Sequence, residues 1–402
     1  MNVLHLSRHS RMDRRITGEM NYLAKKGCQV VFLSPPVNLE GAGISPRVRC
    51  LVSRPAVSGL PTGTTGNARI RKCVLSLPGF LALPLYALLI RIMDRKMYRS
   101  LERRLFQELP GWIPDYIHIH DLRLAEFAIH LKKVFPRVKL IYDSHELTPF
   151  QNSNKKISSY ILKREGHVLR AMDTVITVNS SIAERMSELY GIPRPLVLYN
   201  SQERFTETTG SGSVPLEDFF GIPGLPDSAV KVLFQGSLTP DRNIENLLKA
   251  FQILPEDFHL FVLGSGPEVS LIRKAVSPRI HFHDAVAQID LQRITEQATF
   301  GIIPYLGTNC ENNALCTPNK LFEYINAGLP VCSAELPEVR RILERCGNGR
   351  CYPMETPEKI AYAVRNFADL LAGGEIAKKQ LDLAAETFSY ERQITILDEV
   401  YV

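Results

Sequence analysis

The 402-residue sequence lacks several features that would assign it to a simple class of protein. Its eight cysteines include no C-x-x-C pair, which argues against a structural zinc site and a compact disulfide framework and is typical of a reducing compartment. No signal peptide follows Met1, so we expect a cytoplasmic location. With 45% hydrophobic and 22% charged residues, the composition is that of a globular protein and excludes disordered, collagenous and polytopic membrane classes.

Acidic residues are scarce in the first half of the chain. Residues 1–200 contain 30 Lys and Arg against 15 Asp and Glu, a net charge of +15, whereas residues 201–402 contain 18 against 27, a net charge of −9. This asymmetry predicts that one half meets an anionic surface, and nucleic acid, acidic lipid and a phosphorylated substrate are the candidates.

The most apolar stretch, residues 74–90, has only seventeen residues without a charge and contains Pro78, Gly79 and Pro84. Seventeen residues are the lower limit for a membrane-spanning helix, and proline interrupts helices. Basic residues flank the run on both sides. Residues 69–104 are therefore predicted either to contact an acidic membrane surface or to form a buried core helix followed by a solvated basic helix.

Short β-branched runs alternate with helical patterns in both halves, which predicts an α/β protein with mostly parallel sheets. A helix is expected over 19–26, with Gly27 ending it. The expected strands are residues 3–6, 29–35, 116–120, 139–143, 174–178, 231–236, 259–266, 279–284, 300–305 and 329–334.

A stretch rich in Gly, Ser, Thr and Pro separates the two halves. We therefore predict two facing Rossmann-like, doubly wound domains with an interdomain cleft, and ligands at the carboxyl ends of the strands. The expected segments are a first domain over 1–202, a linker over 203–228, a second domain over 229–380, and a C-terminal helix over 381–402 that packs back on the first domain.

Three strand-to-helix junctions in the second half are suited to binding an anion. Gly236 and Ser237 end one strand, with Arg242 just beyond, and Gly264 to Pro267 form a Gly-x-Gly loop after the next. At the third, Thr317 is a candidate N-cap and Pro318 a candidate first helical residue, which places Lys320 in the first turn and Glu323 one turn further on. A lysine beside the positive end of a helix favours a bound diphosphate there.

These junctions match, in order and spacing, the motifs of one enzyme family. Residues 318–331 (PNKLFEYINAGLPV) resemble its C-terminal signature, residues 232–251 its donor loop, residues 261–267 its Gly-x-Gly-Pro loop and residues 280–305 the segment before the signature. Residues 12–35, 118–121, 141–146 and 173–201 also match. The chain resembles GT-B glycosyltransferases of the family 4 (group 1) type outside residues 50–110 and 203–228. The resemblance implies that the first domain binds the acceptor and the second binds a nucleotide-sugar.

The resemblance implies roles only where residues match. Arg242 and Lys320 would neutralise the donor diphosphate, Glu323 would bind the nucleotide ribose, and His145 would face the donor sugar. Further donor-binding positions are Gly236, Ser237, Gly264, Gly266, Asn319 and Leu321, and the acceptor-side positions are Asp13, Arg14 and His120.

The sequence departs from the family pattern at two positions. Leu315 stands where the first glutamate of the family's pair is expected, so contacts to the sugar hydroxyls must come from elsewhere, with Asn312 and Asn313 as candidates. Ser237 replaces a basic residue after the loop glycine. A divergent donor site and a weakened enzyme both remain open.

Each of these residues also has an ordinary structural interpretation. His145 could be a hydrogen-bonded core histidine, Glu323 a solvated carboxylate and Arg242 a surface charge. Asp13 and Arg14 could form a local ion pair, and His118 and His120 could be structural residues at a strand end, which we favour for His118.

The expected reaction is sugar transfer from a UDP- or GDP-sugar to a hydroxyl of a lipid-linked or glycan acceptor, with retention as the family implies. No Asp-x-Asp motif is present, so Arg242 and Lys320 would replace a divalent metal and no cofactor is expected. Nucleic acid is disfavoured as a partner, because the phosphate loops and the basic excess lie in different halves. A nucleotide-sugar epimerase or hydrolase and a non-catalytic sugar-nucleotide binder are the alternatives, and a peripheral position at the plasma membrane stays open.

Overall fold

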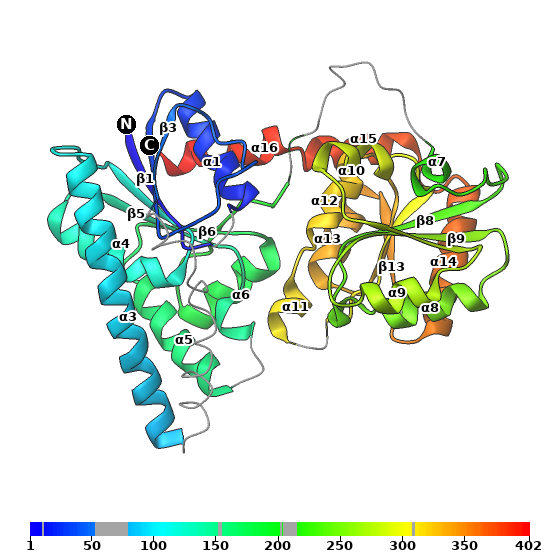
Figure 1. The fold of residues 1–402 in the computed structure, drawn as a ribbon, viewed down its shortest axis with the longest axis horizontal. Coiled ribbons are helices and arrows are strands. Elements are labelled where there is room, and N and C mark those ends of the chain that lie inside the picture. The colour runs from blue at the N-terminus through cyan, green and yellow to red at the C-terminus, as the bar shows by residue number, and fades with distance from the viewer. Residues whose placement is uncertain (10–11, 53–78, 152–154, 202, 204–214, 308–309) are drawn as a thin grey trace. The chain divides into compact units, whose positions relative to one another are not determined.

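The computed structural model describes residues 1–9, 12–52, 79–151, 155–201, 203, 215–307 and 310–402. These residues form two units, one of residues 1–198 with 396–402 and the other of residues 199–395. Each unit is an α/β structure with one parallel sheet, so the predicted fold class is confirmed (Figure 1). Within the described part of the chain, no helix combines the length and the apolar character needed to cross a bilayer.

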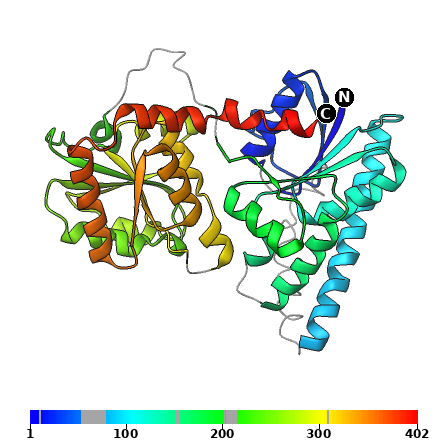
Figure 2. The ribbon, with the colours of Figure 1, turned by 180° about the vertical axis from the view of Figure 1, so that it is seen from behind.

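The first unit has a seven-stranded sheet in the order β3-β2-β1-β4-β5-β6-β7. Its strands are β1 (Asn2–Leu6), β2 (Gln29–Ser34), β3 (Val48–Val52), β4 (Tyr116–Ile119), β5 (Lys139–Ser144), β6 (Thr174–Thr177) and β7 (Leu196–Val197). Its helices are α1 (Arg14–Lys25), α3 (Gly79–Glu108), α4 (Leu122–Val134), α5 (Lys155–Leu169), α6 (Ser180–Tyr190) and α17 (Leu397–Val400), with the 3-10 turn η1 (Thr148–Phe150). The helices α3, α4 and α5 lie side by side on one side of the sheet (Figure 2).

The second unit has a six-stranded sheet in the order β10-β9-β8-β11-β12-β13. Its strands are β8 (Val230–Ser237), β9 (Phe258–Ser265), β10 (Ile280–Asp284), β11 (Phe300–Ile303), β12 (Val331–Ala334) and β13 (Gly349–Tyr352). Its helices are α7 (Leu216–Phe220), α8 (Ile244–Ile253), α9 (Val269–Ala275), α10 (Gln288–Thr295), α11 (Glu311–Leu315), α12 (Asn319–Asn326), α13 (Pro337–Cys346), α14 (Pro357–Ala372), α15 (Lys378–Thr387) and α16 (Tyr390–Ile394), with the 3-10 turn η2 (Pro240–Arg242).

Every predicted strand is present, because each is a short apolar or β-branched run bounded by turn residues. Helix α1 starts before the predicted residue 19 and ends where predicted, with Gly27 at a φ of 87° just past its end. The strands β3, β7 and β13 were not expected from the sequence. Residues 378–400 form three helices in place of one predicted over 381–402, and residues 396–402 belong to the first unit.

Two predicted segments fall partly outside the described residues. Residues 69–78 of the predicted membrane-contact segment are not described, and residues 79–104 lie in α3, which continues through Pro84 instead of breaking there. Of the predicted linker 203–228, residues 204–214 lie outside the described part, and residues 216–220 form α7.

Candidate functional site

Both sheets reverse their strand order at one internal position, which is where α/β sheets bind ligands. In the first unit the reversal lies between β1 and β4, and in the second it lies between β8 and β11. At these two positions helices leave the carboxyl edge on opposite faces of the sheet, so the loops diverge and leave room for a ligand. The residues predicted to bind donor lie at the ends of β8 and β9 and in the segments that follow β8, β9 and β11, whereas His120 and His145 follow β4 and β5.

Close approach of neighbouring backbone requires two loop glycines of the second unit, Gly264 and Gly266. Gly236 pairs with Gly264 where β8 and β9 run in register, and a Cβ atom on Gly264 would lie 1.9 Å from the Gly236 carbonyl oxygen. Gly266 has a φ of 155°, and a Cβ atom there would lie 2.3 Å from the carbonyl oxygen of Leu238. Packing alone therefore accounts for the second loop.

Gly236 differs from the other two loop glycines. Its φ is 108°, and the only described atoms within 4 Å of a Cβ placed on it are Cε and Nζ of Lys320, at 3.6 and 3.9 Å. Gly236 itself and Ser237 are exposed. The missing side chain of Gly236 thus leaves space next to the lysine ammonium, which is where an anion could approach.

The Lys320 side chain is buried, and its Nζ has no hydrogen-bond acceptor among the described residues. It is 4% exposed, and its Nζ lies 3.5 Å from the centroid of the Phe234 ring and 4.8 Å from that of Tyr305. Burial, together with the positive charge of Arg242, lowers the pKa of Lys320 well below its ordinary value, although Glu323 acts in the opposite direction. An unpaired buried cation is costly, and a bound anion would remove that cost.

Arg242 is the last residue of the 3-10 turn η2, and its guanidinium lies over the Tyr305 ring. Its guanidinium carbon is 4.3 Å from the ring centroid, and its Nη1 is 3.1 Å from Asp241 Oδ2. The next residue, Asn243, has a left-handed φ of 59° and donates hydrogen bonds to the carbonyls of Pro304 and Met354. The conformation of Asn243 thereby fixes the turn that carries Arg242, and the predicted basic pair meets at one aromatic ring.

Glu323 is positioned from the sheet by Gln235, which the sequence reading did not identify. Gln235 Nε2 donates to Glu323 Oε2 at 2.6 Å, and Gln235 Oε1 accepts from the Thr295 hydroxyl at 2.8 Å. Gln235 is fully buried on β8, whereas Glu323 is half-buried. The carboxylate is therefore oriented but still accessible. Glu323 is thus not a freely solvated carboxylate on the helix surface.

The start of α12 differs by one residue from the sequence expectation. Pro318 occupies the N-cap position and Asn319 is the first helical residue, so Thr317 lies outside the helix. Lys320 still falls in the first turn, as predicted. Asn319 is exposed and accepts a hydrogen bond from Asn200 at 2.9 Å, whereas the Leu321 side chain lies in the hydrophobic core.

Leu315, at the position of the family's first glutamate, lies in the separate short helix α11. Leu315 ends this helix and is half-buried, Asn312 is buried and Asn313 is half-buried. Cys316 and Thr317 connect α11 to the start of α12. The two candidate asparagines therefore precede the Lys320 turn on one continuous segment.

In the first unit, Asp143 at the end of β5 holds His145. His145 Nε2 lies 3.0 Å from Asp143 Oδ2, and the His145 side chain keeps 16% exposure. Arg15 binds both oxygens of the same carboxylate at 2.7 Å and donates to the Leu198 carbonyl. Burial alone would raise the pKa of Asp143, but the Arg15 charge and hydrogen bonds from His145 and His120 hold it well below its ordinary value. His145 therefore lies beside a fixed negative charge.

His120, predicted on the acceptor side, is only 4% exposed. Its Nδ1 is 3.3 Å from both Asp143 Oδ2 and His145 Nε2, and burial lowers its pKa to about 3 despite Asp143. His118 is fully buried, with its Nδ1 2.6 Å from the hydroxyl of Tyr401. Both histidines are thus interior groups with almost no exposed surface.

The remaining acceptor-side candidates lie at the start of α1. Asp13 is the N-cap of this helix and accepts a hydrogen bond from the Arg15 backbone N–H at 2.8 Å, which accounts for it locally. Arg14 is exposed. The next residue, Arg15, was missed by the sequence reading, because only the fold shows that it crosses to Asp143.

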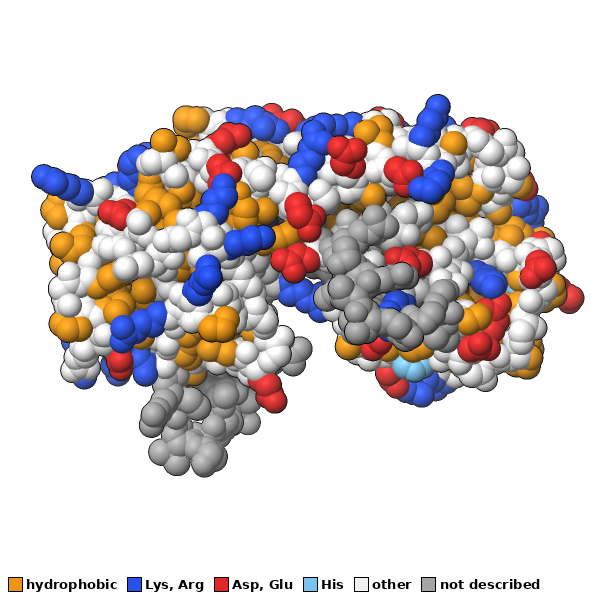
Figure 3. Space-filling view, turned by 90° about the horizontal axis from the view of Figure 1, so that it is seen from above, with side chains coloured by type: hydrophobic (Ala, Val, Ile, Leu, Met, Phe, Trp, Pro, Cys, Tyr) orange, Lys and Arg blue, Asp and Glu red, His pale blue; other side chains and the backbone are white. Residues whose placement is uncertain are grey.

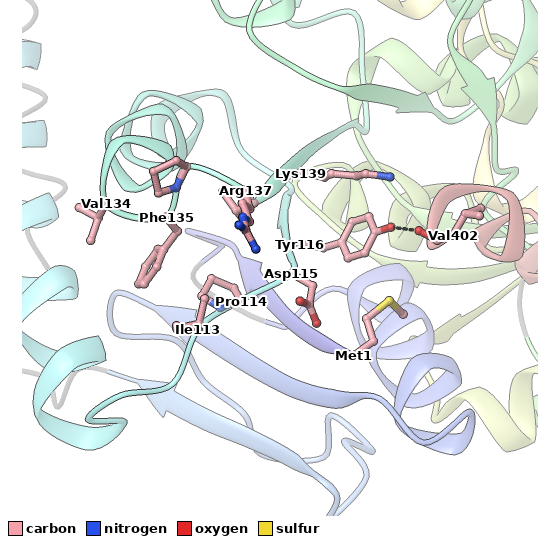
Figure 4. Close-up of a pocket in the computed structure, with 12 residues that line it drawn as sticks. Met1, Ile113, Pro114, Asp115, Tyr116, Val134, Phe135, Arg137, Lys139 and Val402 are labelled. Atoms are coloured by element: carbon pink, nitrogen blue, oxygen red, sulfur yellow. Dashed lines mark hydrogen bonds between the residues drawn. The ribbon is translucent and has the colours of Figure 1, made fainter.

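A pocket of about 730 Å³ lies at the opposite edge of the first sheet, near the starts of β1, β4 and β5 (Figure 4). Met1, Asp115, Tyr116, Lys139 and Val402 are among the residues that line it, and the Tyr116 hydroxyl donates to the Val402 carbonyl. Since ligands of doubly wound sheets bind at the carboxyl edge, this pocket is separate from the candidate site.

Two family models match the chain. Residues 12–201 match Glycosyltransferase Family 4, and residues 229–369 match Glycosyl transferases group 1. A comparison with curated proteins finds no match.

Solved structures with the same fold cover almost the whole chain. Sucrose-phosphate synthase from Thermosynechococcus elongatus has a TM-score of 0.71 at 14% identity, covering 100% of this chain and 98% of its own. HepE from Anabaena in complex with UDP has a TM-score of 0.66 at 13% identity, covering 100% and 99%. WaaG, a glycosyltransferase involved in lipopolysaccharide biosynthesis, has a TM-score of 0.62 at 13% identity, covering 99% of each chain. Together with the two family matches, these likenesses place the chain in the GT-B glycosyltransferases of the family 4 (group 1) type.

Proposed function

We propose that this glycosyltransferase transfers a hexose from a nucleoside diphosphate sugar to an acceptor hydroxyl with retention and without a metal at the diphosphate. The observation that carries the proposal is the buried, unpartnered ammonium of Lys320 beside Arg242 and next to the open position at Gly236. Fixed cations of this kind stabilise the charge that develops on a leaving diphosphate.

In the proposed reaction the bond between the anomeric carbon and the diphosphate oxygen breaks, and the acceptor oxygen bonds to that carbon on the same face. The acceptor proton passes to the leaving diphosphate, so no separate carboxylate base is needed. Lys320 and Arg242 bind the diphosphate, and Glu323, oriented by Gln235, binds the ribose hydroxyls. Because Lys320 is 4% exposed, the diphosphate is expected to reach its ammonium from the open position at Gly236.

The nucleotide is proposed to be UDP or GDP, with UDP supported by the Anabaena protein of the same fold, whose structures are described as complexes with UDP and UDP-glucose. A thermal-shift screen over UDP-, GDP-, ADP- and CMP-sugars should show the largest stabilisation for one of the first two. The anomeric configuration of the product, measured by NMR, should match that of the donor.

Two variants test the assignment of the site. Glu323→Gln should weaken nucleotide binding and transfer, whereas the matched control Glu335→Gln, an exposed carboxylate of the same unit, should behave as wild type. Equal transfer by wild type and Glu323→Gln would refute the ribose assignment. If the protein released free sugar from donor alone as fast as it transferred sugar to an acceptor, the hydrolase alternative would be favoured instead.

The acceptor is proposed to be lipid-linked or a glycan of cell-surface polysaccharide, reached at an acidic membrane surface. The support comes from α3, where Leu85, Leu88 and Ile92 are exposed at helical spacing and basic residues follow. The opposite side of this helix is tied down, because buried Asp94 accepts hydrogen bonds from Arg123 and Arg164. On the face shown in Figure 3, in contrast, acidic, basic and apolar side chains are interspersed.

Sedimentation with vesicles of acidic lipid at low salt tests this surface. Wild type should sediment with the vesicles, and Leu88→Asp should lose most of the binding because it removes an apolar contact and adds like charge to the lipid. Leu383→Asp, an equally exposed leucine of the second unit, is the matched control. Absence of wild-type binding would remove the membrane part of the proposal and leave the donor chemistry intact.

A further inference from the structure

Four buried side chains with metal-binding atoms meet at the carboxyl edge of the first sheet. His5 lies on β1, His118 is its register partner on β4, His120 follows β4, and Glu19 lies on α1. His5, Glu19 and His118 have no exposed surface, and His120 has 4%. Three histidines and a glutamate buried together are unusual, since ionisable groups are rarely buried without partners.

Their donor atoms are spaced as ligands of one ion. Glu19 Oε2 lies 3.6 Å from His118 Nε2 and 3.8 Å from His120 Nε2, and His5 Nδ1 lies 3.0 Å from His120 Nε2. One donor atom from each of the four residues lies within 4.8 Å of the others. Bonds of about 2.0–2.1 Å in a tetrahedral site separate ligand atoms by about 3.3 Å, so a bound ion would draw the more distant of these atoms together.

Four buried atoms of these side chains lack a hydrogen-bond partner among the described residues, whereas His5 Nδ1 and His120 Nε2 share a hydrogen bond with each other. These atoms are His5 Nε2, His118 Nε2 and both oxygens of Glu19, and Glu19 forms an ion pair with Arg15 at 3.2 Å. Leaving buried polar atoms unpaired is costly, and almost all such atoms in native proteins are satisfied. A cation bound among them would supply the missing interaction.

The surrounding contacts resemble those that orient metal ligands. His120 Nδ1 faces Asp143 Oδ2 at 3.3 Å, and His118 Nδ1 faces the Tyr401 hydroxyl at 2.6 Å, which leaves the Nε2 atom of each ring toward Glu19. Arg15 contacts the second oxygen of Glu19. Metal-binding histidines and carboxylates almost always carry such an outer hydrogen bond, because it fixes the ring orientation and the tautomer.

We propose that His5, Glu19, His118 and His120 bind one divalent transition-metal ion, with zinc the best match. Three imidazoles and one carboxylate form a tetrahedral donor set that zinc accepts, and four protein ligands close the site, so the ion is structural. The three rings stack with interplanar angles of 13–33° and must rotate to point at one centre. The ion would tie α1 to β1 and β4.

The neighbouring group of His120, Asp143 and His145 does not need an ion. Asp143 already accepts hydrogen bonds from Arg15, and its contacts to the two histidines are 3.0 and 3.3 Å. The proposed ligands of the ion also differ from the predicted ligands of the donor diphosphate, which belong to the other unit. Metal-independent transfer and a structural zinc ion are therefore compatible.

Metal analysis of the purified full-length chain tests the proposal, with cobalt as a spectroscopic probe. After gel filtration, wild type should retain about one zinc ion per chain, and chelator-treated protein titrated with Co²⁺ should show the intense visible absorption of four-coordinate cobalt. Glu19→Gln and His118→Asn should lose both signals. His281→Asn, which alters a stacked histidine pair of the second unit, is the control that should retain them.

A milder variant keeps the test decisive if those two fail to fold. Tyr401→Phe removes only the hydroxyl behind His118 and should weaken metal binding by about 10- to 100-fold. Wild-type protein that takes up neither zinc nor cobalt would overturn the proposal, as would Tyr401→Phe with unchanged metal affinity. Donor binding measured on the same samples with UDP tests the proposed function separately, because its site lies in the other unit.

Discussion

Replacing Lys320 by methionine should make the protein more stable and its donor binding weaker. Lys320 Nζ has no hydrogen-bond acceptor and is 4% exposed, so the folded protein carries the cost of an unpaired buried donor, about 1–3 kcal/mol. The substitution forfeits a cation–π contact with Phe234, worth about 0.5–2 kcal/mol, but methionine regains about 0.3–1.5 kcal/mol by sulfur–aromatic contact. Loss of repulsion from Arg242 adds to the gain.

The net expectation for Lys320→Met is a gain of about 1 kcal/mol, or about 2–4 °C in melting temperature for a domain of this size. Donor binding should lose a charge-assisted hydrogen bond of about 1.5–3 kcal/mol, which weakens Kd by about 10- to 150-fold. Opposite changes in stability and affinity are what a binding residue held in an unfavourable environment should show.

The stability difference between Lys320→Met and wild type should depend on pH. The pKa of Lys320 is lowered in the folded protein, so the unfolded chain binds more protons above that pKa and wild-type stability rises with pH toward the ordinary value of 10.5. The advantage of Lys320→Met should therefore be largest at low pH and shrink as the pH rises. Thermal unfolding between pH 6 and 10, with and without UDP, measures both effects.

The matched control for this experiment is Lys249→Met. Lys249 is an exposed lysine of the same unit, paired with Glu245. Its substitution should change stability by less than about 0.5 kcal/mol and leave UDP binding unaltered. Wild-type affinity for UDP in Lys320→Met, or a clear loss of stability, would refute this account of Lys320.

Three further outcomes are expected. Gly264→Ala should cost about 1–3 kcal/mol in urea unfolding, because its Cβ would lie 1.9 Å from a carbonyl oxygen of β8, whereas Gly224→Ala, with no atom within 4 Å, should be nearly neutral. Arg15→Met should cost about 3–5 kcal/mol by leaving the buried Asp143 charge unpaired, and a thermal shift no larger than that of exposed Arg14→Met would contradict the ion-pair argument. Transfer should persist in EDTA and should not increase with Mn²⁺, with the zinc content measured in parallel; activity lost in EDTA and restored by Mn²⁺ would disprove metal-independent transfer.

The strands and the phosphate-facing junctions could be predicted because their signals are local. β-branched runs bounded by glycine and proline identify β8, β9 and β11, and the spacing in residues 317–323 places Lys320 in a first helical turn. The short strands β7 and β13 give weaker signals, because two or four residues carry little periodicity. The start of α12 differed by one residue because the fixed φ of Pro318 suits the N-cap as well as the first turn.

The partners of the site residues could not be predicted, because they come from distant parts of the chain. Gln235 and Glu323 are 88 positions apart, and Arg15 and Asp143 are 128 positions apart. The same limit applies to the proposed metal ligands, since Glu19 and His118 meet only when α1 packs on the sheet. Cysteine spacing gives no information about a site built from histidine and glutamate.

A crystal structure with bound UDP-sugar tests the central claim most directly. The account predicts that the diphosphate oxygens lie within hydrogen-bond distance of Lys320 Nζ and the Arg242 guanidinium, with Glu323 at the ribose. A nucleotide bound away from residues 317–323, or one bound while the Lys320 ammonium stays sealed beneath Phe234 and Tyr305, would contradict it.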